Sequence, residues 1–294
     1  MTPAPDTTTD VVEWHLSVEE LRAVRDHLPG LVLPSFVPER TSVVGVGVVD
    51  ALVARGVLAS APALDAESWS DDLDAPFLLS LALQNAGSIV IQVSAWTPTS
   101  TTAHSTVIQA AAASHLTVWT GADHGDGRAR VRGTVLDLAW QTLASLVPEA
   151  EVTDRVHGTT TVSTVASQAI VDAIKGRDAR VLDAVVKELH VPADAVPLFR
   201  GLAEPVRQGF RVKAFTLDGG PVFARNWFGT SHGWLRMSVG LDAAARTGEV
   251  TPERITDAGT VTVTAQTDED IRTELLSLVA GLVRDRDVIG GSNG

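Results

Sequence analysis

Hydrophobic and polar residues alternate in several short stretches of the last third of the chain. The alternation predicts strands at 210–217, 221–228, 234–239 and 260–265, because a period of two residues is typical of a strand with one buried face. The next stretch, 267–283, has leucines and valines at helical spacing. This part of the chain therefore predicts a small antiparallel sheet closed by a helix.

An earlier stretch has a similar order of elements. Strands are predicted at 88–96, 115–120 and 128–133, followed by a helix at 134–147. In the first of these strands, alternation places Ile89, Ile91, Val93 and Ala95 on one face. Aligning 145–147 with 277–279 matches Ser-Leu-Val in both places. The pattern suggests an internal duplication with two related halves.

The other elements are predicted from helix caps and breakers. Ser17 and Glu20 form a capping box that begins a helix. A second helix is expected at 43–58, with Gly56 at its end. Between these helices, 31–38 is interpreted as an edge strand or an extended connector. A short helix capped by Asp65 is expected at 63–73, and an apolar strand at 77–83. The middle of the chain, 152–206, is predicted to be helical, with breaks at Gly176 and Pro192.

Composition limits the class of protein. The chain has 294 residues, of which 45% are hydrophobic and 20% charged, enough for a sizeable core. It has no cysteine, which excludes disulfides and thiol catalysis. Its formal charge of −13 disfavours nucleic acid and anionic membranes as partners. The first ten residues lack the features of a signal peptide, and no apolar run is long enough to span a membrane. We therefore expect a soluble cytoplasmic protein.

The expected domain organisation is a single α+β domain. It would cover 11–286, with an N-terminal half at about 11–150 and a C-terminal half at about 151–286. Residues 1–10 and 287–294 are expected to be flexible ends. No low-complexity linker separates the two halves, which favours one interlocked domain over two independent ones.

One motif suggests catalysis. Residues 229–233, Gly-Thr-Ser-His-Gly, match the G-x-S-x-G nucleophile elbow, in which a serine lies on a sharp turn between a strand and a helix. Here the residues after the motif alternate like a strand. His232 is also the last histidine of the chain, so the usual triad order cannot be formed. A β-turn explains both glycines, and a hydrolase that uses Ser231 is kept only as an alternative.

No other pattern predicts a catalytic, metal or cofactor site. His124 lies in Asp-His-Gly-Asp-Gly, which is typical of a hairpin turn and lacks the alternating oxygen ligands of a calcium loop. The remaining histidines have no partner at metal-ligand spacing. Gly45-Val46-Gly47 lacks the third glycine of a dinucleotide fingerprint. We therefore expect a protein without catalytic residues, metal or cofactor.

Aromatic residues are the remaining candidates for function. Tryptophan and arginine are favoured at the centres of interfaces, and several lie on the predicted strands. On 221–228, Phe223, Arg225 and Trp227 share one face and Phe228 lies on the other. Each aromatic could also simply belong to the core. The candidate partner-binding residues are Arg225, Trp227, Phe228, Trp234 and Trp96.

Four passages in order resemble the EspG family of ESX (type VII) secretion-associated proteins. The first is the helix that opens at 17–21. The second, 50–58 followed by Leu64-Asp65, looks like the family's L-x-A-R-G-L … L-D passage. The third ends in 143–148, and the fourth contains Thr230 and Gly233 where the family often has D-T-x-x-G-R. The chain departs from the family at Gly229, at Trp234 and at 73–76, where Leu-Asp-Ala-Pro replaces L-x-R-P.

The resemblance implies a fold and a function. It implies a central antiparallel sheet flanked by helical bundles, with quasi-two-fold related halves. It also implies a cytosolic chaperone that binds secreted helical proteins of the PE/PPE type and keeps them in a soluble complex before export, without nucleotide or metal. A non-catalytic α+β binding module of another pathway is the alternative.

Overall fold

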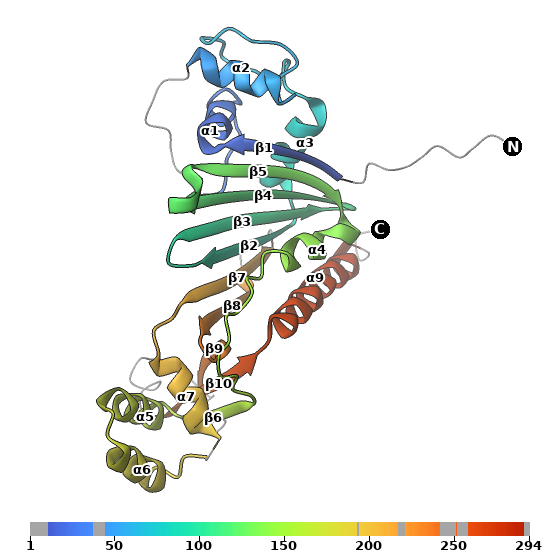
Figure 1. Ribbon diagram of the computed structural model, residues 1–294. Helices are drawn as coiled ribbons and strands as arrows, with labels where there is room; N and C mark the ends of the chain where they lie inside the picture. Colours follow the sequence, from blue (N-terminus) through green and yellow to red (C-terminus); the bar gives the residue numbers. More distant parts are fainter. Residues whose placement is uncertain are drawn as a thin grey trace, which may run out of the picture. The chain divides into compact units, whose positions relative to one another are not determined.

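The structure is a computed structural model that describes residues 11–37, 45–192, 194–216, 221–241, 251 and 258–290 (Figure 1). Within these ranges the chain is α+β. Ten strands form one antiparallel sheet in the order β1-β5-β4-β3-β2-β7-β8-β9-β10-β6. The predicted fold class is therefore confirmed. The flanking helical bundles and the quasi-two-fold relation stay predictions.

The strands and helices have the following bounds. The strands are β1 Val11–Ser17, β2 Ile89–Trp96, β3 Ser100–Gln109, β4 Ala112–Gly121, β5 Gly125–Val135, β6 Thr159–Ser163, β7 Gln208–Thr216, β8 Pro221–Thr230, β9 Gly233–Leu241 and β10 Gly259–Gln266. The helices are α1 Val18–Asp26, α2 Val46–Ala54, α3 Ala75–Ala86, α4 Ala139–Ala144, α5 Thr164–Gly176, α6 Ala179–Glu188, α7 Ala195–Ala203 and α9 Asp268–Gly290.

The chain divides into two compact units, which are described separately. The first comprises Met1–Leu146, Val212–Ala224 and Leu275–Gly294, and the second comprises Val147–Arg211 and Arg225–Glu274. The predicted flexible segment 1–10 lies outside the described residues. Helix α9 continues to Gly290, past the predicted helix end at 283. The single domain with halves at 11–150 and 151–286 stays a prediction.

In the first unit, helix α3 packs on one face of the strands β3, β4 and β5, and helix α1 packs on β5 and β1 (Figure 1). The strands contribute Leu116, Val118, Ala129 and Val131 to this core. The predicted capping box begins α1: the Glu20 amide donates to Ser17 Oγ over 3.0 Å, and the Ser17 amide donates to Glu20 Oε2 over 2.6 Å. Gly56 follows α2 with a φ of +69°, as predicted for a helix end.

Two predictions between α2 and β2 are wrong. Residues 63–73 do not form a helix capped by Asp65, because long-range contacts hold this stretch: the Trp69 ring stacks on His27 at 3.8 Å, and Leu58 bridges to Leu73. The predicted strand 77–83 lies instead in helix α3. Asp74 accepts a hydrogen bond from the Phe77 amide at its start, which is the N-cap arrangement.

Other boundaries also differ from the predictions. The expected helix 134–147 is shorter, because β5 continues to Val135 and a 3-10 turn precedes α4. Residues 31–37 contain no strand, which leaves the connector interpretation. Residues 38–44 lie outside the described part. Strands β1, β3 and β6 were not predicted. Two of them, β3 and β6, are rich in threonine and serine, so their hydrophobic alternation is weak.

In the second unit, helices α5 and α7 pack on strands β10 and β6. Val261 and Val263 of β10 meet Ile170 of α5 and Phe199 of α7 in one core. Asp178 caps α6, and α7 begins at Ala195, next to the predicted cap at Asp194. The predicted strands at 210–217, 221–228, 234–239 and 260–265 are confirmed as β7 to β10. No helix in the described part of the chain is long and apolar enough to cross a membrane.

A buried polar ladder crosses the other face of the first unit's sheet. His104 Nδ1 and Thr117 Oγ1 are 2.8 Å apart, and His104 Nε2 lies 2.7 Å from Thr106 Oγ1. The same Thr106 hydroxyl is 2.8 Å from His115 Nδ1, whose other ring nitrogen lies 3.0 Å from Thr134 Oγ1. Both rings are buried and every ring nitrogen has a hydroxyl partner. The hydroxyl partners therefore satisfy the hydrogen-bonding nitrogens of the two neutral rings inside the fold.

Burial gives these histidines low pKa values in the folded state. Desolvation lowers the pKa of His104, and the nearby His115 and Arg130 lower it further. The pKa of His115 falls from 6.5 to about 3, through desolvation and then the charges of Arg132 and Arg130. The unfolded chain therefore takes up protons at these rings below about pH 6.5, while the folded chain does not.

We predict that these two histidines do not lower the free energy of unfolding above pH 6.5. Below that pH, the free energy of unfolding should decrease as the pH falls toward 3. Each ring would contribute a slope of up to about 1.4 kcal/mol per pH unit. His115→Gln keeps an amide that can hydrogen bond but cannot titrate, so its free energy of unfolding should depend less on pH between 4 and 6.5. Urea unfolding at several pH values measures this. The exposed His157→Gln is the control, and equal slopes for His115→Gln and the parent would refute the assignment.

Candidate functional site

The sheet separates the residues that were predicted to bind a partner. Trp227 pairs with Arg236, and Gly229 with Trp234, so Trp227, Trp234 and Arg236 lie on one face. Phe228 pairs with Leu235 and lies on the opposite face, toward α7. Trp227 and Trp234 are fully buried, so they belong to the core of the second unit. Partner binding by these residues stays a prediction.

A polar network around Glu274 occupies the face with the tryptophans. Arg236 Nη1 donates to both carboxylate oxygens of Glu274, each over 3.0 Å, and Arg225 Nε lies 3.4 Å from Glu274 Oε1. Gln266 links the network to a tryptophan: its amide donates to Glu274 over 3.4 Å, and its carbonyl oxygen accepts from Trp227 Nε1 over 2.6 Å. The side chains thus tie the first turns of α9 to β8, β9 and β10.

The start of α9 is fixed by further hydrogen bonds. Trp234 Nε1 donates to Asp268 Oδ1 over 2.7 Å. The Thr267 amide donates to Asp270 Oδ2 over 2.7 Å, and the Asp270 amide donates to Thr267 Oγ1 over 3.1 Å. These reciprocal bonds form a capping box, and the bonds from the Thr267 amide and hydroxyl lower the pKa of Asp270. The buried Trp234 therefore positions the helix start through its indole N–H group.

We predict that Glu274→Ala destabilises the protein by about 1–3 kcal/mol, because the partly buried Arg236 would lose its paired carboxylate. Glu269→Ala is the matched control, since Glu269 lies on the same helix but is exposed, with a single ion pair to Arg272 at 3.6 Å. That control should change stability by less than about 0.5 kcal/mol. Chemical denaturation measures both, and similar values for the two variants would show that the network contributes little.

The G-x-S-x-G motif forms the turn between β8 and β9, as predicted. Gly233 has a φ of +103°, which favours glycine, and a strand follows it directly. The Ser231 hydroxyl donates a short hydrogen bond to Glu204 Oε2. His232 Nε2 lies 3.1 Å from the other Glu204 oxygen, and His232 Nδ1 lies 2.7 Å from the Asp154 carbonyl oxygen. The turn is therefore attached to α7 and to the segment before β6.

These contacts do not form a nucleophile and base pair. The pKa of the Glu204 carboxyl is lowered, mainly because Ser231 donates a hydrogen bond to it and further because of His232. The His232 ring contacts Glu204 and Asp154, whereas Ser231 donates to Glu204. A serine hydrolase needs the imidazole to accept the serine proton. In the described contacts, the cluster instead fixes a turn.

The opposite face of β9 exposes apolar side chains. Met237 and Val239 pair with Val263 and Val261, so they point to the side on which α5 and α7 pack. The helices cover the two β10 valines, but Met237 is 44% exposed and Val239 is 53% exposed. Phe228 lies on the same face and is half-buried. Phe228, Met237 and Val239, which we call the β9 apolar strip, form an exposed apolar surface on the second unit's sheet.

The sequence prediction missed Met237 and Val239. The alternation in 234–239 was recognised, but it could not indicate which face the helices leave uncovered. Trp96 lies at the end of β2 in the first unit and is 38% exposed. Among the described residues, no group of three or more histidine, aspartate or glutamate side chains could hold a metal ion.

Comparison with known proteins finds similarity in structure alone. No protein-family model and no curated protein matches the sequence. A search of solved structures matches the type VII secretion system chaperone EspG5 of Mycobacterium tuberculosis, which was solved in complex with a PE25–PPE41 dimer. The TM-score is 0.55 at 8% sequence identity, over 90% of this chain and 94% of that chain. The resemblance to EspG proteins is thus confirmed for the fold.

Proposed function

We propose that this protein is a cytosolic specificity chaperone of a type VII (ESX) secretion pathway. It binds a secreted helical protein of the PE/PPE type and keeps it in a soluble complex until export. The observation that supports this is the shared fold with a chaperone of that system over 90% of the chain. Fold alone does not imply function, so the proposal also needs a surface of suitable chemistry.

The β9 apolar strip offers such a surface. Burying exposed apolar area contributes about 25 cal/mol per Å², and Met237, Val239 and Phe228 lie on one side of the sheet next to α7. An exposed apolar helix end of a client would be covered there. The formal charge of −13 would keep the resulting complex dispersed through mutual repulsion. Arg225 and Trp96 stay candidate contact residues from the sequence.

We predict that co-expression with a PE/PPE-type pair from the same gene neighbourhood gives a stoichiometric complex. The client pair alone should aggregate, and the complex should elute as one species on size-exclusion chromatography. If candidate clients are soluble by themselves and never co-purify, the chaperone proposal fails. The non-catalytic α+β module of another pathway would then be the better interpretation.

We predict further that Met237→Glu lowers client capture at least fivefold, because a charge would have to be buried against the client. Leu79→Glu is the matched control, since Leu79 is an exposed apolar residue of α3 in the first unit. Both variants should keep the parent's circular dichroism spectrum. Quantified pull-down with a tagged client measures capture. Equal capture by the parent and by Met237→Glu would show that the client does not contact the β9 apolar strip.

The hydrolase alternative has a direct test. A fluorophosphonate probe labels activated serines, and we expect it to leave Ser231 unlabelled because His232 is directed at Glu204 and Asp154. Ser231→Ala should capture clients as well as the parent does. Stoichiometric labelling at Ser231, lost in Ser231→Ala, would restore the enzyme interpretation.

A further inference from the structure

A row of arginines lies on the face of the first unit's sheet opposite α1 and α3, at the β5 side of the buried polar ladder. Arg128, Arg130 and Arg132 alternate along β5 with Ala129 and Val131, which belong to the core under α1 and α3. All three arginines therefore point to the other face. The register places His15 of β1 opposite Arg130 and Trp119 of β4 opposite Arg128. We call Arg128, Arg130 and Arg132 the β5 arginine row.

Few described carboxylates balance this row. Glu13 Oε2 lies 4.0 Å from Arg130 Nη1 and 3.8 Å from Arg132 Nε, and its other oxygen lies 2.8 Å from His15 Nε2. The 3.8 Å separation is too long for a hydrogen bond, and the buried Arg132 Nε has no hydrogen-bond partner among the described residues. Arg128 is exposed and has no ion pair in the described part of the chain. Arg128 thus has hydrogen-bond donors available to a partner, whereas only 20% of the Arg130 side chain and 25% of the Arg132 side chain are exposed.

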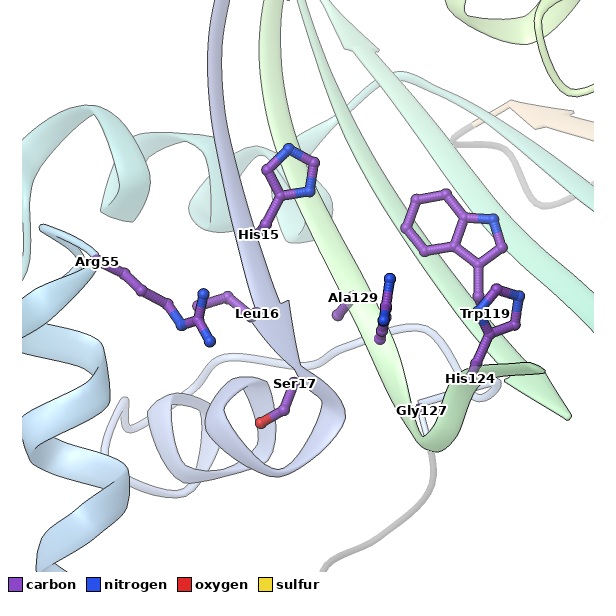
Figure 2. A pocket seen from close by; sticks show the side chains of 9 residues that line it. His15, Leu16, Ser17, Arg55, Trp119, His124, Gly127 and Ala129 are labelled. Carbon is purple, nitrogen blue, oxygen red and sulfur yellow. The ribbon is translucent and has the colours of Figure 1, made fainter. Parts of the chain in front are cut away.

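A cavity of about 670 Å³ adjoins the Arg128 end of the row (Figure 2). His15, Ser17, Arg55, Trp119, His124 and Arg128 are among its lining residues. Figure 2 shows His15 and Trp119 extending from their strands on the same side of the sheet. The Trp119 ring also lies 5.2 Å from the Arg130 guanidinium, a cation–π contact that holds both side chains.

Two polar groups of the cavity have hydrogen-bonding capacity that the described residues do not use. His124 Nδ1 is buried and has no hydrogen-bond partner among the described residues. Arg55 donates one N–H to Glu20 over 3.1 Å and is half exposed, so the rest of its guanidinium faces the solvent. Gly127 lies near the start of β5 beside these groups with a φ of +93°, and a side chain there would come within 2.8 Å of Val18. Glycine at this position therefore lets the hairpin approach α1 closely.

We propose that the β5 arginine row and this cavity bind an extended, carboxylate-rich segment of a partner polypeptide. Arginine forms paired hydrogen bonds with carboxylates. Alternate residues of a strand are about 6.8 Å apart, and an extended peptide with acidic residues at alternate positions has the same repeat. Long polyanions such as nucleic acid fit worse than a short acidic segment, because repulsion from the chain's formal charge of −13 increases with the charge of the ligand. This site lies on different residues from the β9 apolar strip and does not depend on the proposed function.

Fluorescence anisotropy with the full chain tests the proposal. The probe is a fluorescein-labelled peptide that alternates glutamate with serine at four positions, and the control peptide has glutamine in place of glutamate. We expect saturable binding of the glutamate peptide that weakens with added salt, and at least tenfold weaker binding of the glutamine peptide. Equal binding of the two peptides, or no binding of either at low salt, would overturn the proposal.

Variants locate the site. Arg128→Gln should weaken binding at least fivefold, and Arg128→Lys should give an intermediate loss because lysine keeps the charge but not the paired geometry. Arg180→Gln, an exposed arginine of α6 in the second unit, removes the same charge and should change binding less than twofold. Equal losses for Arg128→Gln and Arg180→Gln would indicate nonspecific charge attraction and reject the site. Competition by citrate or phosphate at concentrations similar to the peptide's would identify a small-anion site and likewise overturn the peptide assignment.

Discussion

The two-residue period of the strands determines what each side chain of this sheet can do. Trp227 and Phe228 are neighbours in sequence, yet Trp227 lies on the face of the Glu274 network and Phe228 on the face where α7 packs. Along β5, Ala129 and Val131 enter the core while the arginines between them face away from it. A register shift of one residue would exchange both sets. Core packing on one face therefore fixes the surface chemistry of the other.

This constraint explains which parts of the fold could be predicted. Where one face is buried and the other is polar, alternation is strong: β2 was found with the correct buried residues, such as Ile91, and β10 was found as a strand. A helix start that is fixed by local hydrogen bonds can be predicted equally well, because Ser17 and Glu20 need only each other to begin α1. Strand β3 was missed because its buried residues include the polar His104 and Thr106, which weaken the hydrophobic alternation. Their burial is possible because they form hydrogen bonds with each other and with other strands.

The errors come from contacts between residues far apart in sequence. Residues 63–73 have helix-forming composition, but the stacking of Trp69 on His27 holds them in another conformation. The same limit applies to the site. Sequence identified Trp227 and Trp234 by residue type, and their indole N–H groups in fact bond Gln266 and Asp268 inside the unit. Whether an aromatic faces a partner depends on which helices cover it, and pattern alone does not contain that information.

The two units expose different chemistry for one common reason. A helix covers only the strands it packs on, so the uncovered remainder of a sheet face must be satisfied by solvent or by a partner. In the second unit α5 and α7 pack on β10 and β6, and on that face β9 leaves Met237 and Val239 exposed, which water solvates poorly. In the first unit the arginine side of β5 lies opposite α1 and α3, and water solvates the exposed Arg128 well, whereas Arg132 Nε is buried. An apolar partner would thus gain free energy mainly by removing water from β9. An acidic partner at β5 would instead exchange one set of polar contacts for another, so its binding would depend strongly on salt and on matched geometry.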